Sequence, residues 1–206
     1  MLAWIALLLA VVGSFTLIPD VRAAEYFRAH VQGRARRYLR LVTDYAKGAH
    51  WLVIALAVYG LVQAWIAALG ETEWMRHVSD LSLALLMSMI VASAVLHTIK
   101  LLLGRRRPRD HFEHGLSGVR ALALDSQYDS FPSGHAVTIF CVATVAAAGA
   151  PQFAWAWYAI AAFLALTRAL LTSHYLSDVF FGAALGLFVA RETIYLCFPQ
   201  LAPGWF

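Results

Sequence analysis

The hydrophobic residues of this chain fall into six long runs, separated by shorter polar segments. A helix needs about 20 apolar residues to cross a membrane, and each run approaches that length. The runs cover residues 1–19, 51–69, 80–103, 134–150, 152–172 and 178–199. The gap between the fourth and fifth runs is short, and Arg191 and Glu192 interrupt the sixth. The pattern predicts an all-α, polytopic membrane protein with about six transmembrane helices.

The first run has an alternative interpretation as a secretory signal peptide. Residues 1–19 carry no basic segment before the apolar stretch and no convincing cleavage site of small residues. We therefore expect a first transmembrane helix here, and a single membrane domain over residues 1–206.

The segment of about residues 20–48 has the pattern of an amphipathic helix. Apolar side chains recur at helical spacing, and arginines occupy the other faces. The apolar positions are Phe27, Val31, Ala35, Tyr38, Val42 and Tyr45, and the arginines are Arg28, Arg34, Arg36, Arg37 and Arg40. We expect an interfacial helix lying flat among lipid headgroups. A solvated basic loop broken at Gly33 is the alternative, and either form should favour anionic lipid.

Composition supports the membrane interpretation and raises a question of orientation. Hydrophobic residues make up 61% of the chain and charged residues 14%, which excludes an ordinary soluble domain. With six spans, all of the 16 Lys and Arg residues except Arg76 and Arg191 fall on one side of the membrane. The positive-inside rule would place that side in the cytoplasm. Cys141 and Cys197 lie in apolar runs and are expected to be core residues, not a disulfide or a metal pair.

Two polar clusters flank the fourth run. Lys100 lies near the end of the third run, followed by the basic segment 105–109; a snorkelling lysine and a topology signal are the ordinary explanations. Arg168 lies within apolar sequence, where ionisable residues are costly and often functional. His174 and Asp178 are four residues apart, so on a continuous helix the carboxylate could accept a hydrogen bond from the imidazole. A helix-capping histidine is the alternative.

Between these clusters, the sequence FPSGHA opens the fourth run. Pro132 favours the start of a helix, Ser133 is a good cap, and Gly134 allows the backbone to approach a ligand closely. The free amides of a helix start bind anions, and His135 would stand beside an anion held there.

Together these residues resemble the three signature motifs of the type 2 phosphatidic acid phosphatase (PAP2) superfamily. The matching positions are Lys100-x6-Arg107-Pro108, Pro132-Ser133-Gly134-His135 and Arg168-x5-His174-x3-Asp178. The third motif usually begins Ser-Arg and here begins Thr167-Arg168, which keeps the hydroxyl. The six-span plan is similar to the membrane branch of the family over nearly the whole chain.

The resemblance implies a phosphate-binding set and a catalytic set. Lys100, Arg107 and Arg168 would supply counter-charge to a phosphate, and Ser133 and the amides around Gly134 would complete its cradle.

For the catalytic set, His174, oriented and made more basic by Asp178, would attack phosphorus and form a phosphohistidine. His135 would protonate the leaving group and then activate water.

No metal or other cofactor is expected, because three fixed cations would serve the phosphate and the sequence offers no convergent set of carboxylates. The expected partners are a lipid phosphate and the membrane, with no nucleic acid; oligomeric state stays open.

The loop 109–131 is expected to cover the site as a lid or headgroup-reading segment. Its polar candidates are His111, Glu113, His114, Arg120, Asp125 and Asp129.

The favoured hypothesis is an integral-membrane lipid phosphatase. Its candidate substrates are phosphatidic acid, phosphatidylglycerol phosphate, undecaprenyl pyrophosphate and a lipid A-type glycolipid. A lipid phosphotransferase using the same phosphohistidine is one alternative, and a non-enzymatic protein that binds anionic lipid is the other. The short chain and minimal loops favour a bacterial inner membrane. The resemblance implies an active site that faces the periplasm, against the positive-inside rule.

Overall fold

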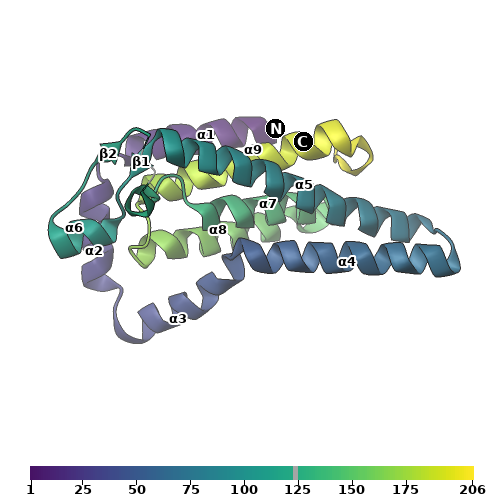
Figure 1. Ribbon diagram of the computed structural model, residues 1–206, viewed down its shortest axis with the longest axis horizontal. Helices are drawn as coiled ribbons and strands as arrows, with labels where there is room; N and C mark the ends of the chain where they lie inside the picture. The colour runs from purple at the N-terminus through teal and green to yellow at the C-terminus, as the bar shows by residue number, and fades with distance from the viewer. Residues whose placement is uncertain (123–124) are drawn as a thin grey trace.

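The six apolar runs all form helices in the computed structural model, which describes residues 1–122 and 125–206. The helices are α1 (Leu2–Thr16), α4 (Gly48–Leu69), α5 (Glu73–Leu102), α7 (Gly134–Gly149), α8 (Ala154–Leu170) and α9 (Leu176–Cys197). They lie roughly along one long axis, and α4 and α5 form a long hairpin at one side (Figure 1). The predicted all-α membrane fold is confirmed.

The helices differ in whether they are long enough to cross a membrane. Within the described residues, four stretches are long and apolar enough, namely Gly33–Leu69, Glu73–Leu102, Pro151–Leu170 and Leu176–Cys197. Helix α1 has 15 residues. It is long enough to cross a membrane only together with α2 (Asp20–His30), and the two helices are bent by 84° from each other. Helix α7 has 16 residues. The six expected spans are therefore supported for four, or for five if the bent pair is one span.

Helix α9 lies at the centre of the bundle and packs against α1, α5, α7 and α8. The contact between α7 and α9 is close because glycines of α9 face the backbone of α7. A Cβ atom on Gly182 would stand 2.5 Å from the carbonyl oxygen of Ser133, and one on Gly186 would overlap the carbonyl of Val137. Small residues of this kind allow helix backbones to approach each other in membranes. The glycines thus bring the starts of the two helices together.

Both cysteines were expected in the core, and only one lies there. Cys141 is fully buried in α7, whereas Cys197 at the end of α9 is exposed. The expectation for Cys197 is therefore wrong, because residues 195–197 at the end of α9 are exposed.

The basic arm forms two helices instead of the one expected over residues 20–48. Helix α2 ends at His30, and α3 (Gly33–Thr43) begins after a break at residues 31–32, followed by the 3-10 turn η1 (Asp44–Ala46). Gly33 has a φ of +55°, which favours glycine and accounts for the break. Both helices contact α8, and the hydroxyls of Thr167 and Thr43 hydrogen-bond at 2.9 Å.

The segment after α5 folds over the same end of the bundle as α2 and α3. Strand β1 (Gly104–Arg105) pairs antiparallel with β2 (Val119–Arg120), and α6 (Pro108–His114) lies between them. The 3-10 turn η2 (Ser126–Tyr128) then leads to α7. Figure 1 shows α2, α6 and both strands at one end and the α4–α5 turn at the other. The three motifs meet at the first of these ends.

We expect Gly186→Ala to destabilise the fold by about 1–3 kcal/mol, because the added methyl group would overpack the contact between α7 and α9. Gly60→Ala is the matched control, since nothing lies within 4 Å of a Cβ at that position of α4. Thermal unfolding of both variants in the same detergent measures the difference. Equal melting temperatures would show that the α7–α9 contact tolerates a side chain.

Candidate active site

His174 lies in the connection between α8 and α9, not on a helix. Helix α8 ends at Leu170 and α9 begins at Leu176, so the two residues do not share a continuous helix, which was the condition for the contact expected from the sequence. The two side chains are nevertheless close, with 3.8 Å between Nδ1 of His174 and Oδ2 of Asp178. They meet because the chain turns into α9 at Tyr175 and brings Asp178 back over the preceding loop.

The His174 ring is oriented by a backbone carbonyl. Its Nδ1 lies 2.8 Å from the carbonyl oxygen of Ser130, and the side chain is 3% exposed. A carbonyl oxygen only accepts hydrogen bonds, so Nδ1 carries the proton and Nε2 keeps its lone pair. From the sequence, Asp178 was expected in this orienting role, and nothing pointed to Ser130.

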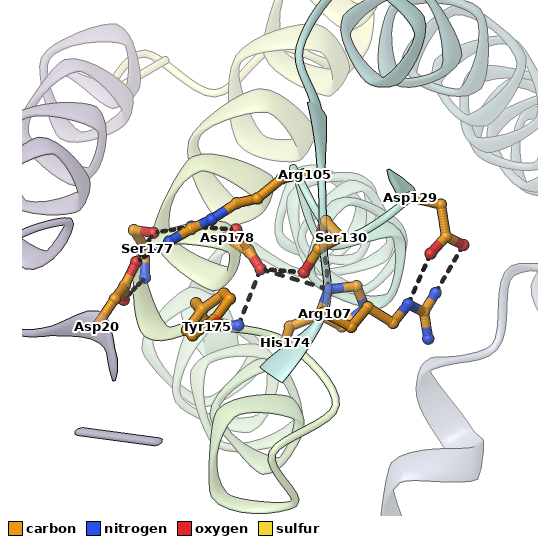
Figure 2. Close-up of polar contacts among 9 residues, drawn as sticks. All are labelled: Asp20, Arg105, Arg107, Asp129, Ser130, His174, Tyr175, Ser177 and Asp178. Carbon is orange, nitrogen blue, oxygen red and sulfur yellow. Dashed lines mark hydrogen bonds and ion pairs between the residues drawn. The ribbon is translucent and has the colours of Figure 1, made fainter. Parts of the chain in front are cut away.

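Asp178 is fully buried and satisfied by three donors. Oδ1 accepts a 2.7 Å hydrogen bond from Nη1 of Arg105, while Oδ2 accepts from the Ser130 hydroxyl at 2.6 Å and the Tyr175 amide at 2.8 Å. Because the hydroxyl of Ser130 binds Asp178 and its carbonyl binds His174, Asp178 acts on the imidazole through Ser130. Figure 2 shows this chain of contacts.

Arg105 joins Asp178 to a second buried carboxylate. Its Nη2 lies 2.8 Å from Oδ2 of Asp20, which is 1% exposed, and its guanidinium lies 4.2 Å from the centre of the Tyr175 ring. The Ser177 amide donates to Oδ1 of Asp20 at 3.0 Å, and the Ser177 hydroxyl also donates to this carboxylate. Burial by itself lowers the pKa of Arg105, but the two carboxylates raise it above its ordinary value.

Sequence reasoning missed Arg105 and Asp20. The signals were weak: Arg105 is one arginine of a basic segment, and Asp20 is a single acidic residue directly after the first apolar run. Asp178 and Asp20, the two partners of Arg105, lie 73 and 85 residues away from it along the chain. Only the fold brings them together (Figure 2).

Arg107, expected to bind phosphate, is held by a protein carboxylate. At the N-cap of α6, its Nε and Nη2 donate to the two carboxylate oxygens of Asp129 at 2.7 and 2.8 Å. Burial raises the pKa of Asp129, but the hydrogen bond and charge of Arg107 outweigh it and lower that pKa overall. A phosphate would therefore share Arg107 with Asp129 or displace it.

The other phosphate-binding candidates lie at helix ends that face the same region. Lys100 is half-buried in the last turn of α5 and Arg168 half-buried in the last turn of α8. Arg168 donates from Nη1 to the Thr43 hydroxyl at 3.4 Å. Gly134 and His135 occupy the first turn of α7, with Ser133 as the N-cap.

Two donors in this region are buried without a protein partner in the part of the chain that the structure describes. They are the hydroxyl of Ser133 and Nε of Arg168. Leaving such a group unpaired costs about 1–3 kcal/mol, more if it is charged, so each is suited to an external acceptor. The Ser133 amide is not available, because it donates to the carbonyl of Asp178 at 2.9 Å. The Ser133 amide therefore cannot take part in the anion-binding site that was expected from the amides of residues 133–135.

Among the loop candidates, Asp129 contacts a motif residue, and His111 lies 3.5 Å from Glu25 on α2. Glu113 lines a pocket with Arg107, whereas His114, Arg120 and Asp125 are exposed. Over residues 1–122 and 125–206, no group of three or more His, Cys, Asp and Glu side chains is arranged to hold a metal ion.

Two apolar pockets reach the start of α7. One, of about 490 Å³, is lined by α1, α5 and α9 and by Phe131 and Pro132. The other, of about 270 Å³, lies between α4, α5 and α7 and reaches Gly134. An apolar chain in either pocket would end beside the polar residues described above.

A comparison with known protein families identifies the family that carries these motifs. The sequence model of the PAP2 superfamily matches residues 81–201, which is more than half of the chain and includes all three motifs. The chain belongs to the PAP2 superfamily. The resemblance seen in the motifs is therefore confirmed.

Two curated relatives are lipid A 1-phosphatases. The protein of Rhizobium johnstonii is 30% identical over 136 residues, which cover 63% of this chain and 55% of the relative. The protein of Rhizobium etli is 32% identical over 111 residues, which cover 53% of this chain and 47% of the relative. The chain spans about half the length of these relatives. Together with the membrane-length helices, they indicate a bacterial membrane protein.

A solved structure shares the fold. The crystal structure of Aquifex aeolicus LpxE matches with a TM-score of 0.54 and 16% sequence identity, over 85% of this chain and 94% of that one. At this identity the likeness concerns the arrangement of the helices.

We expect Asp20→Ala to destabilise the protein by about 1–3 kcal/mol for each donor left unsatisfied, because Nη2 of Arg105 and the amide and hydroxyl of Ser177 lose their buried acceptor. Glu71→Ala is the control: it breaks a bidentate pair with Arg76 at the exposed α4–α5 turn, where solvent screens the charges and no measurable change is expected. Equilibrium unfolding in detergent tests both variants. A similar loss in the two would mean that burial adds nothing to the Arg105 pair.

We expect His174 to titrate below the ordinary histidine value of 6.5. Burial is the largest effect and lowers its pKa. Asp178 opposes this next, and the charges of Arg107 and Arg168 lower the pKa further. Because the neutral form is favoured, the ring stays unprotonated at pH 7 and loses its lone pair only in more acidic solution. Carbon-13 NMR of labelled histidine in micelles, with the signal assigned by its loss in His174→Ala, measures this pKa. A midpoint above 6.5 would contradict the prediction.

Proposed function

We propose that the chain is a membrane phosphatase that hydrolyses a phosphomonoester or pyrophosphate group of an amphiphilic lipid. The observation that carries the proposal is His174, a buried imidazole whose Nδ1 is held by the Ser130 carbonyl and whose Nε2 has no hydrogen-bond partner among the described residues. An oriented, neutral imidazole near several cations is the arrangement that nucleophilic attack on a phosphate requires.

The phosphate would be bound by charge and by the unpaired donors. Lys100, Arg107 and Arg168 balance its negative charge, and Arg168 and Ser133 each offer a buried donor that has no protein partner in the described residues. Charge-assisted hydrogen bonds of this kind are roughly twice as strong as neutral ones. Binding substrate would therefore satisfy groups that the empty protein leaves unpaired.

The reaction would proceed in two displacements. Nε2 of His174 forms a bond to phosphorus, the bond to the lipid oxygen breaks, and the departing alkoxide takes a proton from His135. A water molecule then gives a proton to His135 and attacks phosphorus, and the N–P bond breaks to restore the imidazole. The negative phosphate favours the protonated form of His135 needed in the first step. Asp178 positions His174 through Ser130 and does not touch the reacting atoms.

The apolar pockets that reach Pro132 and Gly134 support a lipid substrate, since acyl chains in them would present a headgroup to the site. Of the four candidate lipids, the names of the Rhizobium relatives favour the 1-phosphate of a lipid A-type glycolipid.

We further propose that the site faces the periplasm of a bacterial inner membrane. Several arginines at that end pair with carboxylates, such as Arg105 and Arg107, which weakens their value as a topology signal.

Phosphate release from purified protein in detergent micelles with EDTA tests the proposal across the four candidate lipids. We expect release to persist without free metal and to fall about 1,000-fold or more in His174→Ala, because the nucleophile is lost. His77→Ala, an exposed histidine near the α4–α5 turn, is the control and should retain activity.

The other outcomes separate the alternatives. Near-normal turnover by His174→Ala would refute the histidine mechanism. Transfer of labelled phosphate to a lipid acceptor without release would indicate a phosphotransferase. Binding of anionic lipid with no turnover of any candidate would support the non-enzymatic interpretation.

A further inference from the structure

A basic pocket of about 380 Å³ lies beside the candidate active site, and of its arginines Arg107 alone belongs to the PAP2 motifs. Five arginines from three helices line it: Arg28 of α2, Arg36 and Arg40 of α3, and Arg107 and Arg109 at the start of α6. Residues 171–173, directly before His174, form another wall. Its volume lies within the usual range for small-ligand sites, about 300–1,000 Å³.

Three of these arginines have no protein counter-charge. Among the residues that the structure describes, no carboxylate oxygen lies within 4.0 Å of Arg28, Arg36 or Arg40. Arg28 lies over the Phe112 ring at 4.3 Å, and Arg36 donates to the Leu171 carbonyl at 3.4 Å.

The pocket wall still carries some negative charge. Nε of Arg109 lies 3.6 Å from Asp110, and Glu113 is the acidic residue in the described lining. The pocket nevertheless gathers like charges that repel each other unless an anion binds between them.

The pocket is separate from the place where the reacting phosphate would bind. Lys100, His135, Arg168 and His174 do not line it, and Arg107 is the cation that the two regions share. A group held between α2, α3 and α6 would therefore lie next to the nucleophile and not on it. Within the pocket, the excess positive charge comes from Arg28, Arg36 and Arg40, since Arg107 and Arg109 each have an aspartate oxygen within 4.0 Å.

We propose that this pocket binds a second phosphate group, carried by the same lipid headgroup as the phosphate that is hydrolysed. This inference rests on the proposed phosphatase function and deepens it. Arginine forks match phosphate oxygens in pairs, so the pocket fixes the headgroup at a distance from the reacting bond. The chain thus selects amphiphiles with two separated phosphates over lipids with one.

The test compares lipid A that carries two phosphates with lipid A that carries only the 1-phosphate, both in neutral detergent micelles. The pocket variant is Arg36→Gln with Arg40→Gln. The matched control is Arg34→Gln with Arg37→Gln, which removes the same charge from exposed positions of α3 outside the pocket lining. Melting temperatures check that both variants fold.

We expect the pocket variant to raise KM for the two-phosphate lipid about tenfold or more with little change in kcat, because charge-assisted hydrogen bonds to the second phosphate are lost. The one-phosphate lipid should change far less, and the control should change neither. Equal losses on both lipids would overturn the proposal in favour of a general attraction to anionic lipid. The absence of any loss would overturn it as well.

Two further measurements identify the source of the phosphate and separate failure of this proposal from failure of the proposed function. If inorganic phosphate changes turnover of the one-phosphate lipid in the wild type but not in the pocket variant, the pocket serves the free ion and the headgroup proposal fails. Binding of both lipids is also measured on the His174→Ala background, where no cleavage is expected. A tenfold binding preference lost with Arg36 and Arg40 supports the pocket even if the wild type releases no phosphate, which would refute only the proposed function.

Discussion

The site depends on one buried ion pair network, in which Arg105 lies between Asp20 and Asp178. A guanidinium and two carboxylates are stable at this depth only when each satisfies the others, because an uncompensated buried charge is very costly. The network ties α2, β1 and α9 together. Asp178 in turn holds the Ser130 hydroxyl, and the Ser130 carbonyl holds His174. The orientation of the imidazole is thus the last link of a chain that starts at the N-terminal arm.

The arginines of the site end divide into two groups with different physical roles. Arg105 and Arg107 are matched by carboxylates and stabilise the loops that carry the motifs. Arg28, Arg36 and Arg40 have no such partner in the described chain and line an open pocket. Residues 20–48 therefore do more than form a basic arm, because α2 and α3 form one wall of this pocket.

Close packing of α7 on α9 sets the other half of the geometry. Gly182 lets the start of α7 lie against α9, and the Ser133 amide donates to the Asp178 carbonyl at 2.9 Å. The N-termini of two helices therefore point toward one region, and each carries a partial positive charge. Together with Arg168, this favours an anion there.

The apolar runs determined the helices, because hydrophobic length and period are local properties of the sequence. The motifs likewise identified Lys100, Arg107, His135, Arg168 and His174 as residues of one site, and their roles there stay predictions. The fifth apolar run, which ends at residue 172, already indicated a helix end before His174, but the sequence could not predict that Ser130 would orient the imidazole. Nor could it predict the pairing of Arg105 with Asp20 and Asp178, which lie 85 and 73 residues away. Such contacts depend on which helices pack together, because buried charges and hydrogen-bonding groups find partners only after the tertiary fold has excluded water.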